Sequence, residues 1–188
     1  MKKKILLIFL TLVMVMTFSG PATALAAKPS DFNSSGIILG ILPSDEFDAG
    51  NSGRVVVQER QLMGYLAGPD ISGPFIMTYQ ANVELYTQEG NFHGTLLVLD
   101  DAYNPTYNLK VNGKSGSDQP VPVFDPIPIF PEGYHLEMTL TINGNYTFAD
   151  GAKGEGKFEG SVIAKLTPQG HIYAFGDSAI SLAGKWQP

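Results

Sequence analysis

The sequence has three histidines that could bind a metal ion: His93, His135 and His171. A zinc site needs three or four ligands that converge on one point, and some of them often stand close together in the sequence. These histidines lie on three different expected strands, and His135 stands on the polar face of its strand beside Glu137. We therefore interpret all three as solvated side chains and predict no metal site.

Carboxylates offer a second possible metal site, this time for calcium. Asp100 and Asp101 could supply oxygen ligands. Asn104 and Asp118 stand nearby in the sequence, but the spacing is not that of a known calcium loop. A solvated turn is the interpretation that we favour.

Nucleophilic catalysis has no support in the residues. The chain has no cysteine, which excludes thiol nucleophiles, thiolate metal sites and disulfides. It has no Gly-x-Ser-x-Gly motif, and its serines fall in expected turns and linkers. The sequence therefore assigns no catalytic residue and implies no cofactor.

The N-terminus has the pattern of a cleavable secretory signal of the bacterial type. Lys2 to Lys4 form a positively charged start, residues 5–18 form an apolar run, and Ala24-Leu25-Ala26 offers the small-x-small pattern that signal peptidase cleaves. A membrane-spanning helix needs about 20 apolar residues, and this run is shorter and meets Gly20-Pro21. We predict a signal peptide over residues 1–26 and a mature chain that works outside the cytoplasm, in the cell envelope or secreted.

The mature chain is acidic, which limits its partners. The sequence has 12 basic and 18 acidic side chains, and removal of the three N-terminal lysines leaves 9 against 18, a net charge of −9. Such a surface repels phosphate backbones and anionic lipid headgroups. We expect no nucleic-acid partner, and no span or electrostatic attachment of the mature chain in a membrane.

Alternation of apolar and polar residues dominates the chain after residue 54. The clearest stretch is Phe75 to Tyr86, where Phe75, Met77 and Tyr79 begin one face and polar residues the other. Strict period-two alternation over this length predicts a half-buried antiparallel strand. The same pattern recurs in Phe92–Asp100, Thr106–Val111, Tyr134–Ile142, Phe158–Leu166 and Ile172–Trp186, and no window after the signal has a helical period. The sequence predicts an all-β domain.

We divide the mature chain into an arm and one domain. Residues 27–53 are rich in glycine and proline and contain one apolar run, Ile37 to Leu42, that could form a first strand. Residues 54–188 form the domain. Within it, residues 119–133 are expected to form an extended crossover, because each proline lacks the N–H group that a central strand donates.

Seven or eight strands must hide their edges, and closure into a barrel removes edges altogether. We predict a single antiparallel barrel of about eight strands, in which the last strand pairs with the first; a two-sheet sandwich is the alternative. Asn112-Gly113 is expected to end a strand, and Asn143-Gly144 to form a tight hairpin turn.

The inward positions of the expected strands mix large and small side chains. A small barrel fills itself with such mixtures, and an excess of small residues opens a cavity. Methionine adapts to apolar pockets, and Tyr79 and the rim residue Asp100 are the polar groups expected to face one. The residues that we predict to contact a ligand are Met77, Tyr79, Ala81, Leu96, Asp100, Met138 and Ala164. A core filled by side chains is the alternative.

Two expected strands begin with a similar phrase, Gly90-Asn91-Phe92-His93-Gly94-Thr95 and Gly156-Lys157-Phe158-Glu159-Gly160-Ser161. In each, a second glycine follows an inward phenylalanine and would let the strand bend, as barrels require.

The segment Gly154-Glu155-Gly156-Lys157-Phe158-Glu159-Gly160 resembles the glycine-rich phrase before a barrel strand in the allene oxide cyclase and dirigent-type barrel proteins. That resemblance implies an eight-stranded barrel with a central apolar cavity and, in some members, cyclisation or stereochemical control of a bound intermediate. The family's double glycine followed by Thr or Ser is replaced here by Ala152-Lys153-Gly154-Glu155, and no family catalytic residue has a counterpart.

Three functions remain open at this point. The first is a secreted binding module that holds a small apolar or amphipathic ligand in its barrel. The second is an extracellular structural or adhesive protein, in which the N-terminal arm contacts neighbours or mediates self-association, for example by adding a strand to an exposed edge. The third is an enzyme of the cyclase type, which depends on the resemblance alone.

Overall fold

The computed structural model describes residues 28–42, 45–48, 53–124, 135–149, 152–166 and 172–187. The predicted signal peptide, most of the proline-rich crossover and His171 lie outside these residues. The described residues contain no helix, and their strands are β1 (Ser30–Leu42), β2 (Asp45–Asp48), β3 (Arg54–Ala67), β4 (Gly73–Glu84), β5 (Gly90–Leu99), β6 (Pro105–Ser117), β7 (Val121–Val123), β8 (His135–Phe148), β9 (Lys153–Leu166) and β10 (Ile172–Gln187).

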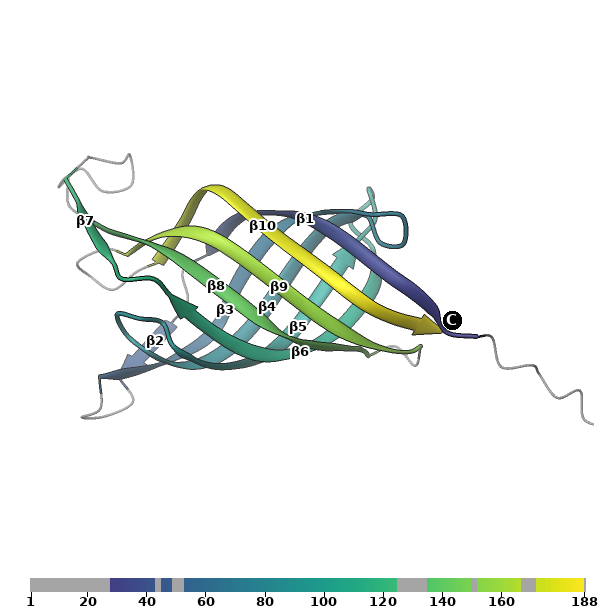
Figure 1. Ribbon diagram of the computed structural model, residues 1–188, viewed down its shortest axis with the longest axis horizontal. Coiled ribbons are helices and arrows are strands. Elements are labelled where there is room, and N and C mark those ends of the chain that lie inside the picture. The colour runs from purple at the N-terminus through teal and green to yellow at the C-terminus, as the bar shows by residue number, and fades with distance from the viewer. Residues whose placement is uncertain are drawn as a thin grey trace, which may run out of the picture.

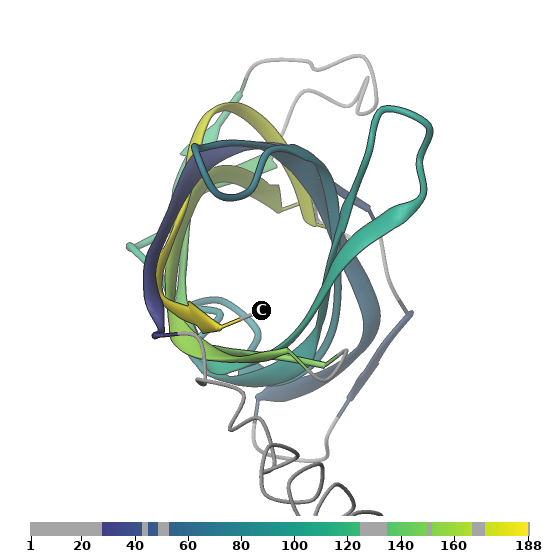
Figure 2. The same ribbon diagram turned by 90° about the vertical axis from the view of Figure 1, so that its right-hand side faces the viewer.

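Eight of these strands form a closed antiparallel barrel, which confirms the predicted fold (Figures 1 and 2). The ring runs β1, β10, β9, β8, β6, β5, β4, β3, and β3 pairs with β1 to close it. The first and last strands also pair, from Ser30 with Trp186 to Gly36 with Ile180. Because one sheet closes on itself, the sandwich alternative is excluded.

The first strand begins earlier than the sequence indicated. β1 begins at Ser30 and is a strand of the barrel wall. Most of the described part of the expected arm therefore belongs to the barrel wall. β2 continues the line of β1, because Leu42 opposite Gln61 and Asp45 opposite Gln58 share one register. β7 likewise lies beyond β6 and pairs only with β8.

The stagger of the barrel sets its width. Pairing followed from Gly36 through β10, β9, β8, β6 and β5 reaches β4 at Val83, whereas pairing through β3 reaches β4 at Gly73, ten residues away. With strands about 4.8 Å apart and a rise of about 3.3 Å per residue, this ten-residue stagger tilts the strands by about 41° and places the backbone about 8 Å from the barrel axis.

The two ends of the barrel differ. At one end, which we call the closed end, the β3–β4 loop folds inward and buries Ile71, which is 1% exposed. The Ser34 hydroxyl donates to the Ile71 carbonyl at 2.9 Å, and Asp70 accepts from the Asn33 N–H at 3.0 Å. The opposite end, the ribbon end, carries β2 and β7 (left in Figure 1).

Both Asn-Gly pairs lie inside strands, so the strand end predicted at Asn112-Gly113 and the hairpin turn predicted at Asn143-Gly144 are wrong. Gly113 in β6 pairs directly with Gly144 in β8. The rings of Phe92 and Phe158, from the strands on either side of this pair, lie 5.8 Å apart. The glycines leave the space that the two rings fill, and a Cβ added to Gly144 would lie 2.1 Å from the Asn112 carbonyl oxygen. Close approach of the backbones, rather than a turn, explains these glycines.

Candidate functional site

Six of the seven predicted ligand residues lie in the barrel interior. Met77, Tyr79 and Ala81 alternate along β4 with exposed fractions of 0%, 4% and 7%. The other three come from β5, β8 and β9 and are also buried: Leu96, Met138 and Ala164. Met77 pairs with Leu96, and Met138 pairs with Ala164.

The seventh residue, Asp100, lies outside the interior. It follows β5 at the closed end, where its carboxylate accepts hydrogen bonds from the N–H groups of Ala102 at 2.9 Å and Asn104 at 2.8 Å. The bonds from Asn104 are the main reason that the pKa of Asp100 lies below its ordinary value. This carboxylate orders the β5–β6 loop.

The two predicted alanines face one another across the barrel. β4 and β9 are four strands apart in a ring of eight, so they form opposite walls. Four successive pairings lead from Ala81 to Phe158, and half of the ten-residue stagger, five residues toward the ribbon end, leads along β9 to the level between Val162 and Ala164. Ala81 and Ala164 therefore lie on opposite walls at nearly one level, in the ribbon-end half of the interior.

A buried arginine lies close to this level, and the sequence analysis did not single it out. The β3 register shifts between Val57 and Arg60, and Glu59 in this bulge has φ = 53°. The bulge changes the phase of the strand, which turns Arg60 inward to 3% exposure, opposite Tyr79. The signal in the sequence was the run Gln58-Glu59-Arg60-Gln61 between two apolar stretches.

The β4–β5 loop brings a second polar group to Arg60. Gln88 is 2% exposed, and its side-chain oxygen lies 3.4 Å from an Arg60 Nη atom. The same amide donates to the Leu85 carbonyl at 2.6 Å. Glu84 holds the loop by accepting from the N–H groups of Tyr86 and Thr87, and although burial raises the pKa of Glu84, these bonds bring it below its ordinary value.

Aromatic side chains occupy the closed-end half of the interior. The rings of Phe32, Tyr146 and Phe148 lie within 6.0 Å of one another, and Tyr107 and Trp186 lie against Phe148. Tyr146 is 1% exposed, and its hydroxyl has no hydrogen-bond partner in the described part of the chain. Burial raises the pKa of Tyr146 to about 12, so this hydroxyl stays protonated. The barrel is thus filled by large rings at one end and has small residues with Arg60 toward the other.

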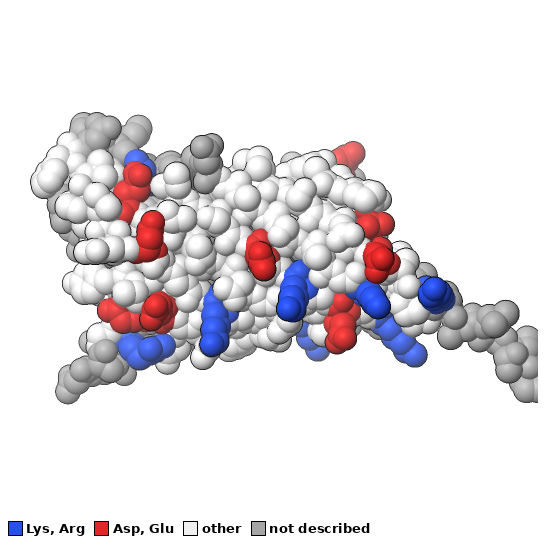
Figure 3. All heavy atoms as spheres, viewed as in Figure 1, with Lys and Arg blue, Asp and Glu red and all other residues white. Residues whose placement is uncertain are grey.

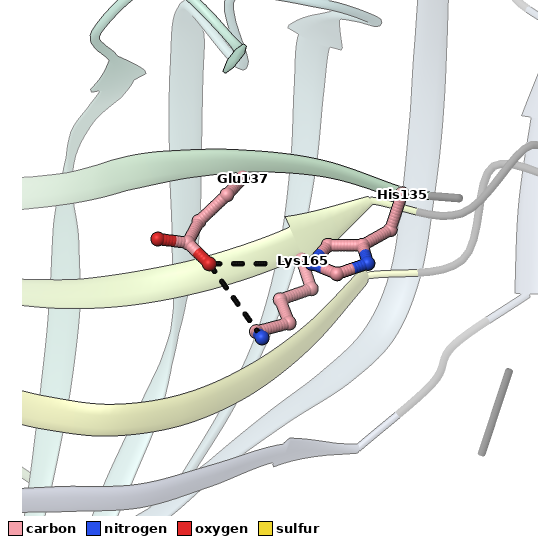
Figure 4. Close-up of polar contacts among 3 residues, drawn as sticks. All are labelled: His135, Glu137 and Lys165. Carbon is pink, nitrogen blue, oxygen red and sulfur yellow. Dashed lines mark ion pairs between the residues drawn. The ribbon is translucent and has the colours of Figure 1, made fainter. Parts of the chain in front are cut away.

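The interpretation of His135 as solvated is wrong, because its side chain is 0% exposed. The pairing of β8 with β7 and β9 shows no register shift here, so His135 lies on the same face as Glu137, as the alternation predicted, and is buried there all the same. Dashed lines in Figure 4 join one oxygen of Glu137 to both His135 and Lys165; this Oε2 lies 4.0 Å from His135 Nε2 and 3.5 Å from Lys165 Nζ.

No group of three or more metal-ligating side chains converges within the described ranges. His93 is exposed on β5. Asp118 accepts from the Thr139 N–H at 2.6 Å near the ribbon end, far along β6 from Asp100 at the closed end. The carboxylates considered for calcium therefore do not share one site.

Among the described residues there is no helix long and apolar enough to cross a membrane.

A groove of about 920 Å³ lies on the outer wall, over β8, β9, β10 and the neighbouring part of β1. Small side chains form much of it, among them Ser35, Ser161, Ala179 and Ser181. Of all the residues that line it, two are charged, Lys157 and Glu159. The sequence analysis did not predict this groove.

Comparison of the chain with protein-family models, with curated proteins and with solved structures found no match. The segment Gly154–Gly160 lies at the start of β9, and its resemblance to the allene oxide cyclase and dirigent-type barrels stays a prediction.

Proposed function

We propose that this protein is a binding module that holds one small amphipathic ligand in the ribbon-end half of its barrel. The observation that carries the proposal is the ten-residue stagger of a closed eight-stranded barrel. A barrel of this size either fills with side chains or holds one small ligand, and its width grows with its tilt.

The lining favours a ligand at the level of Ala81 and Ala164. Ala81 and Ala164 each carry a single methyl group, whereas the closed-end half holds a cluster of aromatic rings. The apolar part of a ligand would contact these alanines together with Met138 and Tyr79. Arg60 brings a positive charge to the same half of the interior, so the polar part would be anionic or carry hydrogen-bond acceptors.

A thermal-shift screen tests the proposal. Long-chain fatty acids, the matching fatty alcohols, terpenoids and aromatic probes are added to the purified protein. A ligand that binds the native state stabilises it by about 2.7 kcal/mol at a hundredfold excess over Kd. We expect a concentration-dependent rise in melting temperature with at least one apolar probe, and a larger rise with the fatty acid than with its alcohol because of Arg60.

Two variants separate binding from a filled core. Ala81→Phe and Ala164→Phe should keep the melting temperature of the free protein and abolish the shift, because the new rings occupy the ligand space. In a filled core each would instead destabilise by about 1–3 kcal/mol or more through overpacking. Destabilisation of both variants together with no shift from any probe rejects the proposal.

The outer wall supports a second candidate, a structural or adhesive protein. Large apolar side chains of β1 and β3 are exposed beside the outer groove, and such patches commonly mark interaction sites. The cyclase hypothesis depends on the resemblance alone, and no residue here is assigned to its chemistry.

A further inference from the structure

Exposed apolar side chains form a ridge on the outer wall, on the two strands that close the barrel. The exposed fractions are 49% for Ile37, 67% for Leu39 and 41% for Tyr65, and Ile37 pairs directly with Tyr65. We call these three residues the ridge. Burial of aliphatic and aromatic side chains of this size removes apolar area that water contacts unfavourably, so the ridge is a surface suited to being covered.

The groove lies directly beside the ridge. Ile37 belongs to both, and the floor beyond it carries Ala179 and Ser181 of β10 and Ser161 of β9. The same wall therefore presents large side chains next to a concave strip of small ones. In a two-fold contact each residue of one surface meets its partner residue reciprocally, so a ridge beside a groove is self-complementary.

The charge of the chain also favours a second copy of the chain as the partner. The chain carries a formal net charge of −6, so two copies repel wherever their acidic side chains meet. In Figure 3 the middle of the upper wall, over β10 and β1, shows no charged side chains, whereas charges gather below it and toward the ends. The two charged residues of the groove, Lys157 and Glu159, have opposite signs. A cationic partner would gain nothing on this wall, while a second acidic copy can approach it without repulsion.

We propose that the ridge and groove form the interface of a symmetric dimer, in which the ridge of each copy packs into the groove of the other. Leu39 and Ile37 are the central contacts from the ridge. Ala179 and Ser181 receive them. The interface lies on the outside of the barrel and does not depend on a ligand inside it.

Sedimentation velocity and light scattering on the purified product of the full chain test the proposal. We expect a concentration-dependent species with twice the mass of one chain. Leu39→Lys should raise the dimer dissociation constant about tenfold or more, which corresponds to about 1.4 kcal/mol. Tyr103→Lys is the matched control, because Tyr103 is 74% exposed in the β5–β6 loop, away from this wall, and it should leave the mass unchanged.

A charge-pair experiment distinguishes the packing of ridge into groove from a nonspecific loss of association. Ala179→Glu places a negative charge in the groove and should also dissociate the dimer. A mixture of Leu39→Lys and Ala179→Glu chains should form a heterodimer, because a ridge lysine then meets a groove glutamate while the second contact stays native. A wild-type chain that stays monomeric at high concentration, or variants that dissociate separately but do not recombine, would overturn the proposal.

Discussion

The hydroxyl of Tyr146 gives a sharp test of the interior. The ring of Tyr146 packs against those of Phe32 and Phe148, the hydroxyl has no hydrogen-bond partner in the described chain, and the residue is 1% exposed. A buried donor without a partner costs about 1–3 kcal/mol. Tyr146→Phe removes the hydroxyl, keeps the ring and breaks no bond, so we expect it to raise the free energy of unfolding at neutral pH by about that amount.

The same variant has a signature at alkaline pH. Burial raises the pKa of Tyr146 to about 12 in the folded state, against an ordinary value of 10.0. A raised folded pKa contributes stability that is present below pH 10 and lost as the pH rises from 10 to 12, because the unfolded phenol ionises first. At pH 11 the wild type should have lost roughly 1 kcal/mol of stability that Tyr146→Phe retains.

Urea denaturation at neutral pH and at pH 11 measures both effects. A change in the midpoint with an unchanged slope reports a change in stability. Tyr107→Phe is the control, because the Tyr107 hydroxyl donates to the Asp70 carbonyl at 3.4 Å and its removal should lower stability slightly. If Tyr146→Phe destabilises the protein by about 1 kcal/mol or more, the hydroxyl has a partner and the reasoning is refuted.

Two further predictions concern the backbone. Gly144→Ala should destabilise the protein by about 1–3 kcal/mol or more, because its Cβ would lie 2.1 Å from a carbonyl oxygen. Gly40→Ala is the control and should be neutral or slightly stabilising, because no atom lies within 4 Å of the new Cβ. Equal melting temperatures of the two variants would contradict this prediction. Asp100→Asn should lower the melting temperature at pH 7, because a carboxylate with a lowered pKa stabilises the folded state when it is ionised. The difference from the wild type should disappear as the pH falls through that pKa, and a difference that persists at pH 2 would argue against the prediction.

Alternation made most of the barrel predictable from the sequence. Phe75, Met77 and Tyr79 face inward as expected. In a long strand with one buried face, the alternation of apolar and polar residues determines which side chains point inward. Arg60 was missed because the phase of β3 changes at a bulge. His135 was misjudged because it is buried although it lies on the polar face of its strand with Glu137. Both effects depend on the neighbouring parts of the fold, which local sequence does not describe.

Glycine is found both in turns and where two backbones approach closely, so an Asn-Gly pair in the sequence does not distinguish the two. Asn143-Gly144 therefore predicted a hairpin, although Gly144 is needed where β6 and β8 approach and Phe92 and Phe158 meet. The opposition of Ala81 and Ala164 was equally out of reach of the sequence, because it follows from the stagger of the whole ring. Asp100 was expected at the rim, facing a cavity, from its place at a strand end, whereas its loop neighbours decide where its carboxylate points.

The pairing of β1 with β10 makes completion of the barrel a late event in folding. Ser30 meets Trp186 across a sequence separation of 156 residues, and contacts of such long range are formed slowly because the loop that they close is long. A chain that is still being made has no partner for the free edges of β1 and β9 until its last strand is available. It therefore stays an open sheet throughout that time, and its two unpaired edges can pair with other chains before the barrel closes.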